Sequence, residues 1–257
     1  KPIAAAPGLP DPRRRGPFRP FATDPGWHEA WWWLAIPALA AAFVLVSYRI
    51  DPAWHGAWVT RESGLLETGQ FIFMVMGLAI AVQLLFDPFV RRRPLILAAT
   101  AGAALACFYI GGEEVSWGQH IFFWQSPGLV TEINGEGEFS LHNVNKAFER
   151  APRTVLELGV LVGGVLIPLA CAFAPNLRRS RLALFLPGAA LMPLALFALF
   201  FKLAGTLSKH GLAASVAARP SEAVEFYMYF FIFAYLVTFE RRIRALAAEG
   251  APSGAEG

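Results

Sequence analysis

The polar side chains best suited to chemistry are concentrated in one segment, residues 111–120. Two adjacent carboxylates, a hydroxyl, an amide and an imidazole come from Glu113, Glu114, Ser116, Gln119 and His120. If a helix continues through the segment, Glu113, Ser116 and His120 share one face of it. Because carboxylates and imidazoles are the usual groups of general acid–base catalysis, the two glutamates and the histidine are candidate catalytic residues, with the hydroxyl and the amide in support. The alternative interpretation is a solvated helix end with an interfacial tryptophan anchor.

A second histidine, His142, lies further along the same predicted loop and is followed by Asn143. His142 is a candidate catalytic residue, as a general base or a metal ligand, and Asn143 is a supporting polar residue. Because imidazole and carboxylate groups bind divalent metals, Glu113, His120 and His142 form a candidate metal site. A divalent metal is therefore a candidate cofactor, although the spacing matches no H-E-x-x-H zinc motif. Further candidate ligands, in other loops, are His55 and His210.

Acidic residues also stand where two other apolar segments begin. Arg61 and Glu67 flank the start of the second apolar segment, and Glu222 and Glu225 flank the start of the sixth. An unpaired ionised side chain inside a membrane costs at least about 2.5 kcal/mol and usually marks a functional site. We therefore predict that these residues support one polar site together with the first segment. Cations that could neutralise the acids include Arg61 and Lys202.

Six apolar segments position these groups. About 20 helical residues are needed to cross a hydrocarbon core of about 30 Å. The predicted spans are residues 31–48, 65–86, 94–110, 155–173, 182–201 and 223–239. The chain is 56% apolar and 16% charged, whereas soluble domains are about 45–50% apolar and about 25% charged. The sequence thus predicts an all-α, polytopic membrane protein with six transmembrane helices.

The charges alternate between the gaps that separate these spans. Arginine clusters at residues 13–15, 91–93, 178–181 and 241–244 occupy every second gap. Those gaps hold 14 of the 22 Lys and Arg and 7 of the 19 acids, which leaves 8 cations and 12 acids for the other gaps. Since cytoplasmic loops are enriched in Lys and Arg, both termini are predicted to be cytoplasmic. The clusters are explained as topology signals, so no nucleic-acid partner is predicted.

The chain is predicted to form one membrane domain with short tails. Residues 1–26 are expected to be a disordered cytoplasmic tail, residues 27–245 the six-helix domain, and residues 246–257 a flexible tail. The longest outer loop is residues 111–154, in which Pro152 is expected to stop a short helix. The alanine- and arginine-rich composition favours a bacterial inner membrane, with the polar site facing the periplasm.

The segment GEEVSWGQHIFFWQSPG, followed by LHN, resembles an uncharacterised group of bacterial multi-pass membrane proteins. Those proteins carry a similar E-E-[IV]-S-W-G-Q-x-I-F segment, then L-H-N in the same loop, and acidic openings like RESGLLE and SEAVEF. The resemblance covers roughly residues 61–145 and 221–226. It implies that these residues act as a unit, but it supplies no mechanism.

Three functions are compatible with the pattern. The first is a membrane-embedded enzyme that acts on a lipid or lipid-linked head group, with membrane lipids as its partners. The second is a non-catalytic subunit of a membrane complex that binds a partner subunit, a cofactor or a pigment. The third is a small transporter, which six spans without internal repeats fit less well. The residues do not decide the substrate, the metal or the oligomeric state.

Overall fold

The computed structural model describes residues 23–61, 63–122, 124, 146–174, 176–177 and 180–250. The regular elements within these residues are helices: α1 (Trp27–Ile50), α2 (Pro52–Trp54), α3 (Leu65–Phe86), α4 (Pro88–Arg91), α5 (Pro94–Glu114), α6 (Gln119–Phe122), α8 (Lys146–Leu161), α9 (Ile167–Phe173), α10 (Met192–Lys209) and α11 (Pro220–Gly250). Short π-helical turns lie at His55–Val59 and Val162–Leu166, and 3₁₀ turns lie at Ser116–Gly118, Arg181–Leu184 and Ala189–Leu191.

Six helical segments in the described part of the chain are long and apolar enough to cross a membrane. They are Trp33–Ile50, Leu65–Phe86, Pro94–Glu114, Arg153–Phe173, Leu182–Lys209 and Pro220–Glu249. The 22 residues of α3 extend over about 33 Å, which matches a hydrocarbon core of about 30 Å. The predicted all-α, six-span membrane protein is confirmed.

Two spans differ from the prediction in their local structure. The helix α8 runs through Pro152 and joins the fourth span, so the predicted helix end at this proline is wrong. In membrane bundles, neighbouring groups can satisfy the carbonyl that a proline frees. The fifth span is interrupted around Pro187, and its main helix α10 begins only at Met192. The sequence places Pro187 and Pro193 inside the predicted fifth span, where a proline favours a kink, and the interruption lies between the two 3₁₀ turns on either side of Pro187.

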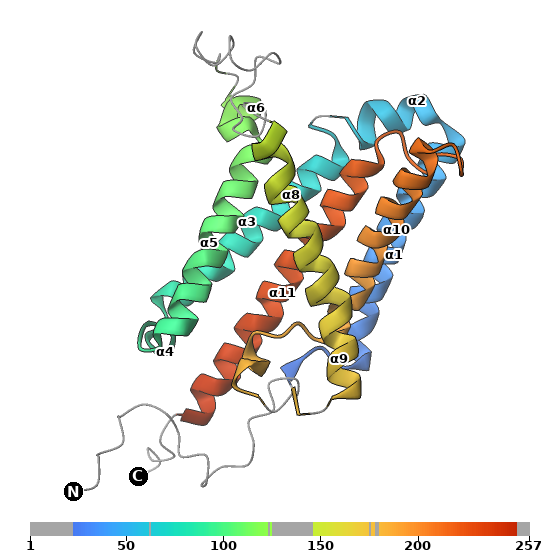
Figure 1. Ribbon diagram of the computed structural model, residues 1–257. Coiled ribbons are helices and arrows are strands. Elements are labelled where there is room, and N and C mark those ends of the chain that lie inside the picture. Colours follow the sequence, from blue (N-terminus) through green and yellow to red (C-terminus); the bar gives the residue numbers. More distant parts are fainter. Residues whose placement is uncertain are drawn as a thin grey trace, which may run out of the picture.

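The last helix, α11, lies at the centre of the bundle (Figure 1). It packs against α3 on one side and α10 on the other, and α3 also packs against α5. Phe73 of α3 stacks on Phe230 and Phe233 of α11, with ring centroids 4.5 and 5.8 Å apart. Gly164, in the π-helical turn after α8, permits a close approach to α10, because a Cβ there would lie 2.3 Å from the Cβ of Ala195. Apolar side chains also cover the outward faces, as lipid contact requires.

The two ends of the bundle differ in charge. The start of α1, the short helix α4 and the end of α11 lie at one end (Figure 1). We call it the arginine end, after Arg91, Arg92, Arg93, Arg241 and Arg242. The starts of α3 and α11 and the end of α5 lie at the opposite end. We call it the acidic end, after Glu67, Glu114, Glu222 and Glu225.

One arginine of the arginine end is completely buried. Arg242 has no exposed surface, and its Nε and Nη2 donate to the Asp24 carboxylate at 2.9, 2.7 and 2.8 Å. Its Nη1 donates to the carbonyl oxygens of Ala183, Leu184 and Leu186. Asp24 belongs to the segment that the sequence assigns to a tail, yet it anchors the chain before α1 to α11. Arg242 is thus a packing residue in addition to a member of an arginine cluster.

Candidate functional site

Four carboxylates from three helices lie near the acidic end, within range of electrostatic interaction with one another through Glu114. They belong to Glu67 of α3, Glu114 of α5, and Glu222 and Glu225 of α11, and we call them the carboxylate cluster. Glu114 interacts electrostatically with the other three. Its Oε1 accepts a hydrogen bond of 3.1 Å from the hydroxyl of Tyr229, which is buried. The helix α11 thus supplies both a hydrogen-bond donor to Glu114 and two of the carboxylates that interact with it.

The helix dipole accounts for two of the four carboxylates. Glu67 lies in the first turn of α3 and Glu222 in the first turn of α11, where the helix dipole favours a negative charge. Glu225 follows Glu222 by three positions, so both lie on the same side of α11. Glu114 is the last residue of α5, where the dipole disfavours a carboxylate. Helix stability therefore does not explain why a glutamate occupies position 114.

Hydrogen bonds hold the starts of α3 and α11 together at the cluster. Gln70 is buried, and its Nε2 donates to the backbone carbonyl of Glu222 at 2.9 Å. The backbone N–H of Ser63 donates to the carboxylate of Glu67, which fixes that side chain at the helix start. Arg61, a predicted supporting residue, is exposed in the turn before α3.

A chain of ion pairs connects the cluster to α8 and α10. Arg153 of α8 lies with its Nη1 2.8 Å from Glu225 Oε1 and its Nε 3.3 Å from Glu157 Oε1. The same Glu157 oxygen lies 2.6 Å from Lys202 Nζ of α10. Three helices are thereby joined through charged groups at the membrane boundary.

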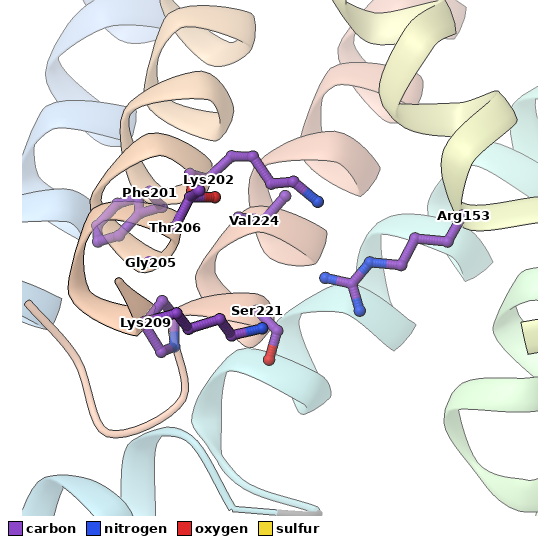
Figure 2. A pocket seen from close by; sticks show the side chains of 9 residues that line it. Arg153, Phe201, Lys202, Gly205, Thr206, Lys209, Ser221 and Val224 are labelled. Atoms are coloured by element: carbon purple, nitrogen blue, oxygen red, sulfur yellow. The ribbon is translucent and has the colours of Figure 1, made fainter. Parts of the chain in front are cut away.

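A cavity of about 110 Å³ lies between α8, α10 and α11, beside these ion pairs. Figure 2 shows Lys202 and Lys209 on α10 and Arg153 opposite them, directed toward the same space. We call it the cationic cavity, because three basic side chains and no acid are among its lining residues. Ser221 and Val224 of α11 close one side of it.

A second, apolar cavity of about 190 Å³ adjoins the first. We call it the apolar groove. Lys202 and Val224 line both spaces, so the two are neighbours along α10 and α11. The polar members of its lining, Thr154, Glu157 and Lys202, are outnumbered by apolar side chains, which are Leu158, Val160, Leu161, Ala195, Ala198, Leu199, Val224 and Met228. A polar pocket and an apolar one thus share a boundary.

The segment that carries Glu113 and Glu114 does not form one continuous helix. The helix α5 ends at Glu114, and Ser116 and Trp117 then adopt positive φ values of 45° and 52°. Such left-handed backbone is costly for residues other than glycine and often occurs at functional sites. The turn returns Trp117 to α5, where its Nε1 donates to Glu113 Oε1 at 2.6 Å. The condition for one helical face through this segment, a helix that continues past Glu114, is not met, because α5 stops there.

The two adjacent glutamates consequently have different surroundings. Successive residues of an α-helix point about 100° apart. Glu113, which is 9% exposed, contacts the returning Trp117, whereas Glu114 faces Tyr229 and the carboxylate cluster. Of the supporting residues in the turn, Ser116 is buried and Gln119 is half-buried. Glu113 thus stabilises the turn, and Glu114 belongs to the cluster.

The predicted metal site stays a prediction. The side chain of His120 and all of His142 and Asn143 lie outside the described residues. Across the described ranges, no three His, Cys, Asp or Glu side chains are grouped closely enough to hold a metal ion. His55 is buried with its Nδ1 2.8 Å from a serine hydroxyl of α1, and burial lowers the pKa of its imidazole. His210 is exposed at the end of α10.

Comparisons with protein-family models, curated proteins and solved structures find no match for this chain. The likeness to a bacterial group through the GEEVSWGQ and LHN motifs therefore stays a prediction.

Sequence reasoning missed the basic residues of the cationic cavity other than Lys202. Arg153 precedes Glu157 by one helical turn, which is a local signal for an ion pair. Its contact with Glu225 joins residues far apart in the sequence and has no local signal. Lys209 stands at the end of α10, where a lysine is also expected simply because it interacts favourably with the helix dipole.

Proposed function

We propose that this integral membrane protein is an enzyme of the bacterial inner membrane. It acts on the head group of a lipid or of a lipid-linked molecule, and its site faces the periplasm. The carboxylate cluster supplies the acid–base chemistry, with Glu114 as the principal proton acceptor.

The observation that carries this proposal is the position of Arg153. Its side chain contacts Glu225 of the carboxylate cluster and also lines the cationic cavity. A head group held in the cavity would therefore lie beside Glu225, which interacts electrostatically with Glu114. A general acid or base must lie within hydrogen-bond reach of the proton that it transfers, directly or through one water.

The contact between Glu114 and Tyr229 supports an acid–base role. The Tyr229 hydroxyl donates to Glu114, and both groups interact with the charge of Glu225. A carboxylate in this position can take a proton from an attacking hydroxyl or water. The unfavourable placement of Glu114 at the end of α5 is also consistent with selection for chemistry over helix stability.

Turnover of native lipids tests the proposal. Purified protein incubated with a total bacterial lipid extract, including lipid-linked glycans, is expected to convert at least one lipid class into a product with an altered head group. Mass spectrometry of the lipids before and after incubation detects the change, and heat-denatured protein is the control. If the lipid composition stays unchanged with and without added divalent metal, the enzyme proposal fails.

A non-catalytic binding subunit is the second candidate. The specific observation in its favour is that Glu113, Glu114 and Glu225 each contact a side chain of the same protein, namely Trp117, Tyr229 and Arg153. Such contacts are also expected of acidic residues whose role is only to hold helices together. An absence of lipid turnover, together with a stable complex in mild detergent, would favour this candidate.

The proposed orientation makes a direct prediction about accessibility. The variants Ala213→Cys at the acidic end and Ser180→Cys at the arginine end are compared after Cys107 and Cys171, which are both buried and free, are replaced by Ser. A membrane-impermeant maleimide applied to intact cells should label Cys at position 213 and leave position 180 unlabelled until the cells are lysed. The reverse pattern would place the acidic end in the cytoplasm.

A further inference from the structure

We infer that the cationic cavity and the apolar groove together bind one molecule of an anionic phospholipid. The phosphate occupies the cavity and an acyl chain lies in the groove. This inference rests on the proposed function and deepens it, because it names the class of substrate that the site receives.

The cavity has the chemistry of a phosphate site. Arg153, Lys202 and Lys209 approach it from two helices, and Ser221 adds a hydroxyl (Figure 2). The contacts with Glu157 and Glu225 engage Nε and Nη1 of Arg153, but a guanidinium has five N–H donors. The 31-residue helix α11 also begins at Pro220, on the wall of the cavity, so the positive end of its dipole lies there.

The groove has the chemistry of an acyl-chain site. Its α8 wall extends from Thr154 to Leu161, which is about 10 Å of helix directed away from the acidic end. Leu158 lines it and is 55% exposed, so this wall is open toward the surrounding hydrocarbon. Since Lys202 and Val224 line both spaces, a single amphipathic molecule can occupy the two at once.

The arrangement favours a lipid over a soluble anion. A free phosphate or sugar phosphate would leave the adjoining aliphatic walls without a ligand, whereas a phospholipid buries apolar surface there. Arg153, Lys202 and Lys209 outnumber the two acids that pair with them, Glu157 and Glu225, and this excess of one positive charge favours a head group of net negative charge over a zwitterionic one. Through Arg153, the bound phosphate would also lie next to Glu225 and the carboxylate cluster.

Lipid binding to delipidated protein in detergent tests this site by native mass spectrometry. The probes are phosphatidylglycerol, phosphatidylcholine with the same acyl chains, and glycerol 3-phosphate. Phosphatidylglycerol is expected to bind at least about tenfold more tightly than either of the other two, because only it has both a net negative head group and acyl chains.

Variants of the lining residues locate the binding. Lys202→Gln and Lys209→Gln should each weaken phosphatidylglycerol binding about tenfold, since each removes a charge-assisted contact. Lys202→Arg should retain binding, and Leu158→Trp should weaken the lipid but not glycerol 3-phosphate. The matched control is Arg49→Gln, which removes an exposed cation at the end of α1 that does not line the cavity. An unchanged unfolding temperature shows that each variant keeps its fold. Lys209→Gln tests the cavity without breaking an ion pair between helices, because the Lys202–Glu157 pair stays in place.

Three results would overturn the inference. They are equal affinity for the two lipids, binding of glycerol 3-phosphate as tight as that of phosphatidylglycerol, or equal losses of phosphatidylglycerol affinity in the Arg49→Gln and Lys209→Gln variants.

These outcomes are separable from failure of the proposed enzyme. Glu114→Gln should bind phosphatidylglycerol like the parent protein, because Glu114 does not line the cavity. Lost lipid selectivity in a protein that still converts lipids overturns only the site assigned here. Selective binding without any conversion overturns only the enzyme.

Discussion

Asp24→Ala is expected to lower the free energy of unfolding by about 3–5 kcal/mol. The substitution removes the carboxylate that pairs with Arg242 and leaves a guanidinium with no exposed surface without its counter-charge. Removing one member of a buried ion pair is far more costly than replacing both by apolar groups. Unfolding by heat or by sodium dodecyl sulfate in mixed micelles, followed by circular dichroism, measures the loss.

The matched control is Glu29→Ala. Glu29 pairs with the neighbouring Arg241 at 2.7 Å, but both side chains are about two-fifths exposed, at 41% and 42%. Such exposed pairs contribute about 0–1 kcal/mol. The double variant Asp24→Leu with Arg242→Met should recover much of the stability, because no buried charge remains. If Asp24→Ala and Glu29→Ala have equally small effects, the pairing of Asp24 with Arg242 does not hold α1 to α11.

The membrane spans could be predicted from the sequence because hydropathy is a local property. The second span, Leu65–Phe86, begins and ends where the composition predicts. Local structure inside the spans was harder to predict, since neighbouring helices decide whether a proline interrupts a helix. Thus α8 continues through Pro152, whereas the fifth span is interrupted around Pro187.

The carboxylate cluster could be anticipated only in part. The cost of acids near hydrocarbon suggested that they converge, and the structure brings Glu67, Glu114, Glu222 and Glu225 together. The separation of Glu113 from Glu114 could not be anticipated, because it depends on where α5 ends and on the left-handed turn at Trp117.

The basic side of the site could not be found from the sequence. The contact of Arg153 with Glu225 depends on how α8 packs against α11. A residue between two predicted spans offers no local pattern for such a contact. The cavity and the groove are likewise products of packing, since their walls come from three helices.

Glu114→Gln is expected to reduce lipid conversion by at least about 100-fold, because general acid–base catalysis contributes roughly 10²–10⁴-fold to a rate. The substitution preserves the shape of the side chain and still accepts the Tyr229 hydrogen bond, but it can no longer take up a proton. It also removes one charge from a group of interacting carboxylates, so the unfolding temperature should stay equal or rise. Tyr229→Phe should cause a smaller loss, since it leaves the carboxylate in place.

Glu113→Gln is the control that separates chemistry from folding. Its amide oxygen can still accept the hydrogen bond from Trp117 Nε1, so the turn after α5 and the activity should both be retained. The variants are compared by two measurements in the same detergent. One is the conversion rate of the lipid class found to be converted, over a range of pH, and the other is the unfolding temperature.

Full activity of Glu114→Gln would make the carboxylate cluster a structural contact between helices. A loss that follows a lowered unfolding temperature would assign Glu114 to the fold. A loss at unchanged stability, with Glu113→Gln active, requires that Glu114 acts on the substrate, because the two adjacent residues then differ only in what their side chains face.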